Sequence, residues 1–193
     1  MKTDDPIARI VEWLEHARAR EPEDAEAMSV ATVDADGQPS LRMVLVRGID
    51  DRGLAFYTNL TSRKARDIEH NAAVALCFHW KSTGRQIRIE GRAALVAADE
   101  ADAYFASRPR ESQIGAWASK QSSTLEGRFK LEQRVVRYAA TFAIGPVPRP
   151  GFWSGYRVAP ERVEFWEKRP YRLHERTLFE RDGDGWQSRR LYP

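Results

Sequence analysis

Residues 28–59 read MSVATVDADGQPSLRMVLVRGIDDRGLAFYTN, in which apolar runs alternate with short turn signals. Asp36-Gly37 separates MSVATV from SLRMVLVRGI, and Asp51-Arg52-Gly53 separates that second run from LAFYTN. An Asp-Gly pair between two apolar runs is typical of a β-hairpin, because both residues accept the backbone of a tight turn. This stretch therefore predicts consecutive antiparallel strands.

The rest of the chain continues the pattern. Further strands are expected at 72–80, 86–96, 156–166, 171–181 and 186–193. Residues 182–185, Asp-Gly-Asp-Gly, predict the final hairpin turn. The regular βαβ alternation of a parallel sheet is absent from the sequence, as is a GxGxxG loop. We expect a mainly β protein with peripheral helices, built as an antiparallel barrel or sandwich.

Helices are expected at the edges of the sheet. Asp5-Pro6 is a helix start, because a capping side chain precedes a proline at the first helical position. Three further helices are expected, the first with Ser62 as its N-cap: 62–71, 99–108 and 122–140. Between the last two, RPRESQIGAWASKQ (108–121) is polar and is expected to be an irregular loop.

The chain is expected to form a single domain over residues 1–193, because its length suits one hydrophobic core. Three parts are distinguished within it: an N-terminal helical segment at 1–27, a helical insertion at 99–141 and C-terminal strands at 152–193.

Composition argues against several classes of protein. No apolar run approaches the ~20 residues that span a bilayer, and the N-terminus lacks the order of a signal peptide, so a cytoplasmic protein without a membrane partner is expected. The net charge is only +3 and the arginines are dispersed, which favours small anionic ligands over nucleic acid. Cys77, the only cysteine, is expected to be buried and inert, and no histidines have metal-ligand spacing, so no metal is expected.

Two segments place cations on regular elements. In RMVLVR (42–47) two arginines flank an apolar strand centre, where they could grip anions or simply be solvated. Arg63 and Lys64 occupy the first turn of an expected helix, where a bound anion would offset their unfavourable interaction with the helix dipole. A solvated basic turn is the alternative interpretation.

Two later segments are also unusually polar. Residues 104–123 are dense in hydroxyls, amides and arginines, which indicates either a functional loop or a surface excursion. On a strand, Arg172, His174 and Arg176 would share one face, and such a concentration of cations suits an anion or solvent.

Together these segments resemble the pyridoxamine 5′-phosphate oxidase family. The resemblance runs from about Asp5 to Pro193 and is carried by RMVLVR, FYTN..SRKA, RQIRIEG, SRPRESQIGAWASKQSS, FWSGYRV, EFW…RLHER and the terminal RLYP. It implies an antiparallel split β-barrel homodimer that binds FMN in two clefts at the subunit interface.

The resemblance also implies site residues. Those implied for FMN are Arg42, Met43, Val44, Leu45, Tyr57, Thr58, Arg63, Lys64, Gln86, Gln121, Ser122, Trp166 and Arg176. Of these, the last four would approach the flavin bound mainly by the partner subunit. Those implied for the substrate are Arg47, Tyr104, Arg108, Ser112, Arg172 and His174, with the 99–141 insertion carrying the phosphate loop. Arg172 and His174 would lie nearest the reacting carbon, as the catalytic pair.

The reaction implied is hydride transfer from C4′ of pyridoxamine 5′-phosphate or pyridoxine 5′-phosphate to the flavin, giving pyridoxal 5′-phosphate. Amine oxidation gives an imine that hydrolyses, whereas the alcohol gives the aldehyde directly. Dioxygen would reoxidise the flavin and yield hydrogen peroxide, so the cofactor carries the redox chemistry. The resemblance thus predicts an enzyme of vitamin B6 synthesis and salvage.

Three departures from the family pattern stand out. Arg47 replaces a frequent lysine, so a planar fork replaces a point donor. Glu175 replaces a frequent aspartate. No counterpart precedes residue 1 for the family arm whose arginine and tyrosine can close over the substrate, so we expect a weaker or different lid.

Two alternatives stay open at this point. The flavoprotein oxidase of phenazine biosynthesis shares the basic helix start and the RLHER block, but the intact RPRESQIGAW segment favours a phosphorylated substrate here. A non-catalytic split-barrel module that binds flavin, haem or pyridoxal phosphate is the other, and the presence of both a flavin set and a substrate set argues against it.

Overall fold

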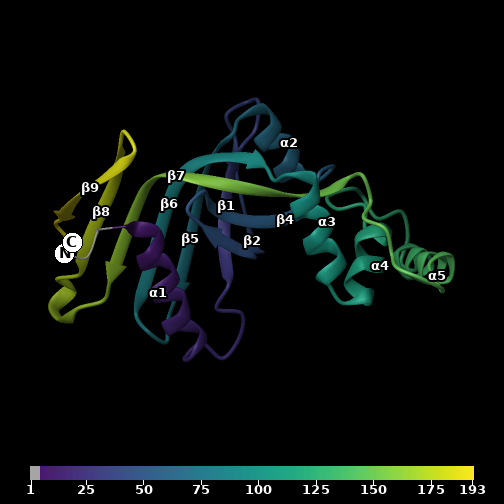
Figure 1. Ribbon diagram of the computed structural model, residues 1–193, viewed down its shortest axis with the longest axis horizontal. Coiled ribbons are helices and arrows are strands. Elements are labelled where there is room, and N and C mark those ends of the chain that lie inside the picture. The colour runs from purple at the N-terminus through teal and green to yellow at the C-terminus, as the bar shows by residue number, and fades with distance from the viewer. Residues whose placement is uncertain (1–4) are drawn as a thin grey trace.

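The computed structural model describes residues 5–193 (Figure 1). The strands are β1 (Ala27–Val33), β2 (Pro39–Leu45), β3 (Gly48–Asp50), β4 (Gly53–Asn59), β5 (Ala73–Trp80), β6 (Arg85–Leu95), β7 (Trp153–Glu167), β8 (Glu175–Asp182) and β9 (Gly185–Leu191). The helices are α1 (Pro6–Arg18), α2 (Arg63–His70), α3 (Ala98–Ser107), α4 (Arg110–Ala118) and α5 (Lys130–Thr141), with a 3₁₀ turn η1 (Pro170–Arg172). The predicted mainly β architecture with peripheral helices is confirmed.

The strands form one curled nine-stranded sheet in which every pairing is antiparallel. Its order is β2-β1-β5-β6-β7-β4-β3, and β8 and β9 continue from β7. β7 is 15 residues long, and two strands pair along the same edge of it. β4 pairs with residues 153–158, and β8 pairs with residues 162–167. The two halves of β7 therefore lead to opposite ends of the molecule, one carrying α3–α5 and the other β8–β9 (Figure 1).

Helix α1 lies across the sheet and contributes to its core. Ile10, Leu14 and Ala17 are buried, and the Trp13 ring meets the Phe165 ring edge-on at 5.1 Å. Burying a side chain the size of Ile10 or Leu14 stabilises a fold by about 1.5–3 kcal/mol. The predicted start is confirmed, since the Asp5 carboxylate accepts the Ile7 N–H at 2.9 Å. Residues 1–4 of the expected 1–27 segment lie outside the described residues.

The segment expected to be an irregular loop, 108–121, instead contains helix α4. Its buried side chains Ile114 and Ala118 are one helical turn apart, and Glu111 in the first turn complements the helix dipole. Conversely, the helix expected over 122–140 forms only as α5, from Lys130 onward. The backbone is already left-handed at Ser122 (φ 68°), a conformation that cannot begin a right-handed helix.

Two predicted strands also end differently. β2 stops at Leu45, and the Arg47 N–H donates to the Ala55 carbonyl at 2.8 Å, so Arg47 lies beyond the strand that was expected to carry it. β8 begins only at Glu175, after the turn η1. The expectation that Arg172, His174 and Arg176 share one strand face is therefore wrong.

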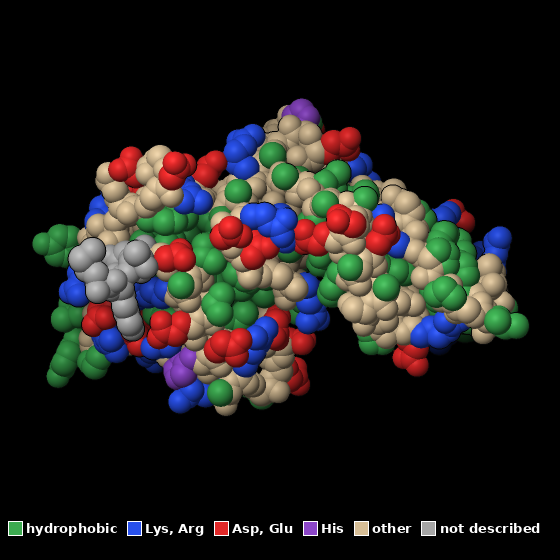
Figure 2. Space-filling view, viewed as in Figure 1, with side chains coloured by type: hydrophobic (Ala, Val, Ile, Leu, Met, Phe, Trp, Pro, Cys, Tyr) green, Lys and Arg blue, Asp and Glu red, His purple; other side chains and the backbone are tan. Residues whose placement is uncertain are grey.

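The structure also bears on two expectations drawn from composition. Cys77 on β5 is half-buried rather than buried, and burial raises the pKa of its thiol, which favours the less reactive neutral form. On the face shown in Figure 2, acidic and basic side chains are interspersed rather than gathered into one basic stripe. Within residues 5–193, no helix combines the length and the apolar character needed to cross a membrane.

Candidate active site

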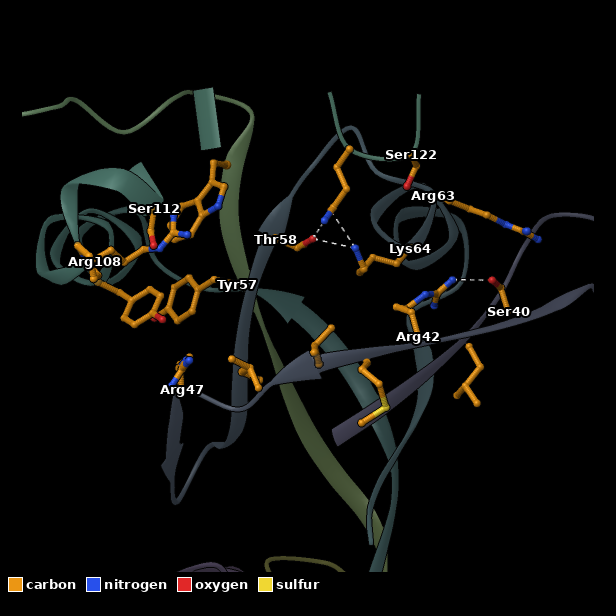
Figure 3. Close-up of a pocket in the computed structure, with 18 residues that line it drawn as sticks. Ser40, Arg42, Arg47, Tyr57, Thr58, Arg63, Lys64, Arg108, Ser112 and Ser122 are labelled. Atoms are coloured by element: carbon orange, nitrogen blue, oxygen red, sulfur yellow. Dashed lines mark hydrogen bonds between the residues drawn. The ribbon is translucent and has the colours of Figure 1, made fainter. Parts of the chain in front are cut away.

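A pocket of about 840 Å³ opens between the sheet and the helical end of the molecule (Figure 3). It brings together ten of the thirteen residues expected to hold flavin, namely Arg42, Met43, Val44, Leu45, Tyr57, Thr58, Arg63, Lys64, Gln121 and Ser122. It also brings together four of the six expected at the substrate, namely Arg47, Tyr104, Arg108 and Ser112. Residues as far apart in the sequence as Arg42 and Ser122 thus line one cavity.

At one end of the pocket, Arg42 is held in place by its own hairpin. β1 and β2 pair Val30 with Arg42, and the guanidinium crosses to β1 to donate to the Thr32 hydroxyl (2.6 Å). It also donates to the Ser40 hydroxyl at 2.7 Å and lies 3.7 Å from the Asp67 carboxylate. Several hydrogen bonds together hold the planar guanidinium group in one orientation. Arg42 is therefore oriented before any ligand binds.

Lys64 lies beside Arg42 and is buried. Its ammonium group donates to Thr58 Oγ1 (3.0 Å) and to Gln121 Oε1 (2.9 Å). Within residues 5–193, no carboxylate lies at ion-pair distance from Lys64. Burial, and secondarily the charge of Arg42, lower the Lys64 pKa to about 8. A bound anion at this end would favour the charged form and raise this pKa again.

Two other residues complete this end of the pocket. Arg63 lies at the start of α2 and is directed toward Asp34, 3.4 Å away. Ser122 lines the pocket with a left-handed backbone, and non-glycine residues in that conformation cluster at ligand sites. Gln121 and Ser122 were expected to approach the flavin of the partner subunit, but the structure places them with Lys64 of their own chain.

At the other end, Arg108 lies between α3 and α4 with its guanidinium 4.9 Å from the centre of the Trp153 ring. Its Nη1 atom is buried and has no hydrogen-bond partner among the described residues. Burial lowers the Arg108 pKa, and the nearby Arg47 lowers it further. A buried N–H without a partner is unfavourable, so this atom marks a position for an acceptor from a ligand. Ser112, in the first turn of α4, lines the same end (Figure 3).

Stacked aromatic rings line the pocket beside Arg108. Tyr57 stacks on Tyr104 with centroids 3.9 Å apart and on Trp153 at 5.5 Å. Gly155 faces Tyr57 across the β4–β7 pairing, and a Cβ atom there would lie 2.7 Å from the Tyr57 ring. Only glycine therefore lets the ring lie flat across β7. The Tyr57 hydroxyl contacts Glu100 at 3.4 Å, and burial raises its pKa to about 12, so it stays protonated.

Sequence reasoning missed four residues that line this pocket: Ser40, Leu41, Pro109 and Trp153. Trp153 is the most informative, because it contacts both Tyr57 and Arg108. The signal was its place in the FWSGYRV motif, which was noted for the resemblance but given no role.

The five remaining predicted residues lie outside this pocket, on or beside β6–β8. Gln86, Trp166 and Arg176 are directly opposite one another across these strands. The Trp166 and His174 rings are 4.5 Å apart. Arg172 is exposed, and both Tyr171 and Arg172 have positive φ (57° and 61°), a strained pair of the kind found at functional sites. We call the five remaining residues the C-terminal cluster: Gln86, Trp166, Arg172, His174 and Arg176.

The tautomer of His174 follows from its contacts. Its Nδ1 atom accepts the backbone N–H of Arg169 at 3.2 Å, and a backbone N–H can only donate. Neutral His174 therefore carries its proton on Nε2, which is left as a donor toward a ligand.

Comparisons with known proteins agree over the whole chain. Residues 14–142 match the family described as pyridoxamine 5′-phosphate oxidase, and residues 153–193 match the pyridoxine 5′-phosphate oxidase C-terminal dimerisation region. The chain is 55% identical to a pyridoxine/pyridoxamine 5′-phosphate oxidase of Rhodospirillum rubrum, covering 98% of this chain and 96% of the relative. It is 54% identical to the enzyme of the same name from Gluconobacter oxydans, covering 98% and 94%.

Two solved structures share the fold. PhzG from Burkholderia lata, in complex with tetrahydrophenazine-1-carboxylic acid, superposes with a TM-score of 0.94 at 33% identity, covering 100% of this chain and 94% of PhzG. An FMN-binding protein from Nostoc punctiforme superposes with a TM-score of 0.79 at 20% identity, covering 96% of each chain, and so supports the fold alone.

Proposed function

The chain belongs to the pyridoxamine 5′-phosphate oxidase family, and from that premise we propose that it uses FMN to oxidise pyridoxamine 5′-phosphate and pyridoxine 5′-phosphate to pyridoxal 5′-phosphate. The observation that carries the proposal is one pocket with two cationic ends, Arg42–Lys64 and Arg47–Arg108 (Figure 3). A phosphorylated cofactor and a phosphorylated substrate need two such ends in one cavity.

The family match and the FMN-binding fold relative indicate a flavin. The residues present fit the phosphate of FMN, because Arg42 is already fixed and Lys64 is buried without a carboxylate partner among residues 5–193. The hydroxyls of Ser122 and Thr58 lie at the same end. Such a set binds a terminal phosphate through charge-assisted hydrogen bonds.

The other end suits the substrate phosphate. Arg108 offers its Nη1 atom, which has no hydrogen-bond partner within residues 5–193, and Arg47, Tyr104 and Ser112 line the pocket around it. Stacked Tyr57, Tyr104 and Trp153 form an aromatic wall beside Arg108, against which a pyridine ring could pack.

We propose that a second copy of the chain completes each site. The matched dimerisation region, 153–193, contains Trp166, Arg172, His174 and Arg176, none of which lines the pocket of its own chain. In a two-fold dimer, the C-terminal cluster of one subunit would cover the pocket of the other.

Bound FMN would supply the acceptor for the hydride that leaves the substrate carbon, and dioxygen would regenerate it. The side chains of the protein would orient the substrate and polarise its reacting group. Arg47 and Arg108 would anchor the phosphate, and the Nε2–H of His174 would donate to the pyridine substituents. Arg172, presented by its strained turn, would place a positive charge over the ring.

The purified protein should be yellow and should release FMN rather than FAD on denaturation. One compact cationic end suits a single terminal phosphate. Chromatography of the released flavin measures its identity, and anaerobic addition of pyridoxamine 5′-phosphate should bleach the flavin band. A protein that stays colourless with added FMN would contradict the proposed function.

FMN affinity should fall as the pH rises through about 8, because the Lys64 pKa lies near 8 in the free protein. Above that pH, Lys64 must regain a proton to pair with phosphate, so the dissociation constant should rise by at most about tenfold for each pH unit. Flavin fluorescence titrations between pH 7 and pH 9.5 measure this. Lys64→Met should bind more weakly at pH 7 and lack this pH dependence; a variant that keeps the wild-type slope would remove Lys64 from the phosphate site.

Oxidation of a phenazine precursor is the second candidate, because PhzG is similar to this chain over its full length. The ligand of PhzG is a carboxylic acid, whereas Arg108 and Arg47 together offer the higher charge that suits a phosphate dianion. Anaerobic bleaching by pyridoxamine 5′-phosphate, compared with bleaching by tetrahydrophenazine-1-carboxylic acid, separates the two candidates.

A further inference from the structure

Glu164 is a buried carboxylate on the strand that carries Trp166. Its side chain is 9% exposed. It lies directly opposite Arg88 of β6, and it is two residues from Trp166, which lies opposite Arg176. Because alternate residues of a strand share a face, Glu164 lies on the same sheet face as Gln86, Trp166 and Arg176.

Both carboxylate oxygens of Glu164 accept hydrogen bonds from Arg176. Arg176 Nε donates to Oε1 at 2.7 Å, and Nη2 donates to Oε2 at 3.1 Å. A third bond runs from Arg176 Nη1 to the Tyr192 carbonyl at 3.0 Å, which ties in the terminal RLYP motif. Arginine has five N–H donors, so these three bonds fix the guanidinium plane and leave two donors for a ligand.

A carboxylate this buried is retained only when it is paired, and a second cation shares it: Arg88 Nη1 donates to Oε2 at 3.2 Å. Arg88 is half exposed, whereas Arg176 is the more buried partner. The arrangement therefore holds Arg176 in one orientation before any ligand arrives, which lowers the entropy lost on binding.

We propose that Glu164 is a positioning residue for the flavin, acting through Arg176. The inference rests on the proposed function, in which Arg176 contacts the FMN held in the pocket of the partner subunit. Glu164 itself need not touch the flavin.

Glu164→Gln is the direct test. Gln keeps the shape but presents an amide N–H₂ to one of the arginines, so the bidentate grip is lost. The FMN dissociation constant, measured by quenching of flavin fluorescence, should rise about tenfold, by analogy with the loss of outer-shell partners of metal ligands. Glu90→Gln is the matched control, because Glu90 lies on the same face and contacts Arg162 (3.1 Å) and Arg88 (3.6 Å). It should leave FMN affinity unchanged.

A double-mutant cycle separates positioning from general stabilisation. If Glu164 acts through Arg176, adding Glu164→Gln to Arg176→Ala should change the FMN dissociation constant by less than about twofold. Additive effects in the cycle would overturn the proposal. Circular dichroism at the assay temperature confirms folding, and if Glu164→Gln does not fold, Glu164→Asp, which keeps the charge but shortens the reach, takes its place with the same expectation.

The outcomes also distinguish this inference from the proposed function. A wild-type protein that binds FMN and oxidises substrate, alongside a Glu164→Gln variant with unchanged FMN affinity, would overturn the inference and leave the function standing. A wild-type protein that binds no FMN would overturn both.

Discussion

Arg108→Ala should lower kcat/KM for pyridoxamine 5′-phosphate roughly tenfold to a hundredfold, because a charge-assisted hydrogen bond contributes about 1.5–3 kcal/mol. The free protein should lose little stability, since the variant also removes a buried N–H that has no partner among the described residues. Activity and stability should therefore separate. Steady-state peroxide formation and thermal unfolding of the same preparations measure the two effects.

Unphosphorylated pyridoxamine is the internal comparison for this variant. Its kcat/KM should already be low in the wild type and should not fall further in Arg108→Ala, because no phosphate is there to lose a partner. Arg110→Ala is the matched control, since Arg110 lies two residues away and donates to the backbone carbonyls of Gly145 and Phe142 rather than lining the pocket. An equal loss on both substrates would show that Arg108 supports folding rather than phosphate recognition.

Local sequence signals predicted the parts of the fold that depend on local chemistry. Asp36-Gly37 and residues 182–185 lie in the hairpin turns that they predicted, and Asp5 caps α1. These features succeed because turn and cap preferences act over a few residues. The same holds for Arg63 and Lys64, which a helix start places at the pocket.

Other features depend on contacts between distant residues and could not be predicted from local pattern. The division of β7 between β4 and β8 is one, because both pairings use the same strand edge. Helix α4 was missed because its polar composition hid the buried pair Ile114 and Ala118. The left-handed turn at Tyr171 and Arg172 was missed because neither residue favours positive φ, and only the surrounding structure imposes it.

The division of the site follows from the same topology. Arg108 and the pocket lie at the end of β7 that pairs with β4, whereas Arg172 follows the end that pairs with β8. The resemblance implied clefts at the subunit interface but placed Arg108 and Arg172 in one substrate set, and the fold shows that one chain keeps these two arginines apart. In a dimer with a two-fold axis, the pocket of each chain can meet the C-terminal cluster of the other chain, which gives two equivalent sites.

Mixed dimers test this division directly. Arg108→Ala damages the pocket and Arg172→Ala damages the C-terminal cluster, so each homodimer should have little activity. A hybrid of the two chains has one doubly damaged site and one intact site, because the intact pocket of one chain meets the intact cluster of the other. Random assembly makes half of the dimers hybrid, so co-expression should restore about a quarter of wild-type activity.

Hybrids of Arg108→Ala with Arg47→Ala, in which both pockets are damaged, should show no recovery. Purification through two different affinity tags isolates the hybrids, and peroxide formation measures them. If the hybrid of pocket and cluster variants were as inactive as its parents, each site would belong to one chain, and the composite site would be wrong even though the family assignment stands.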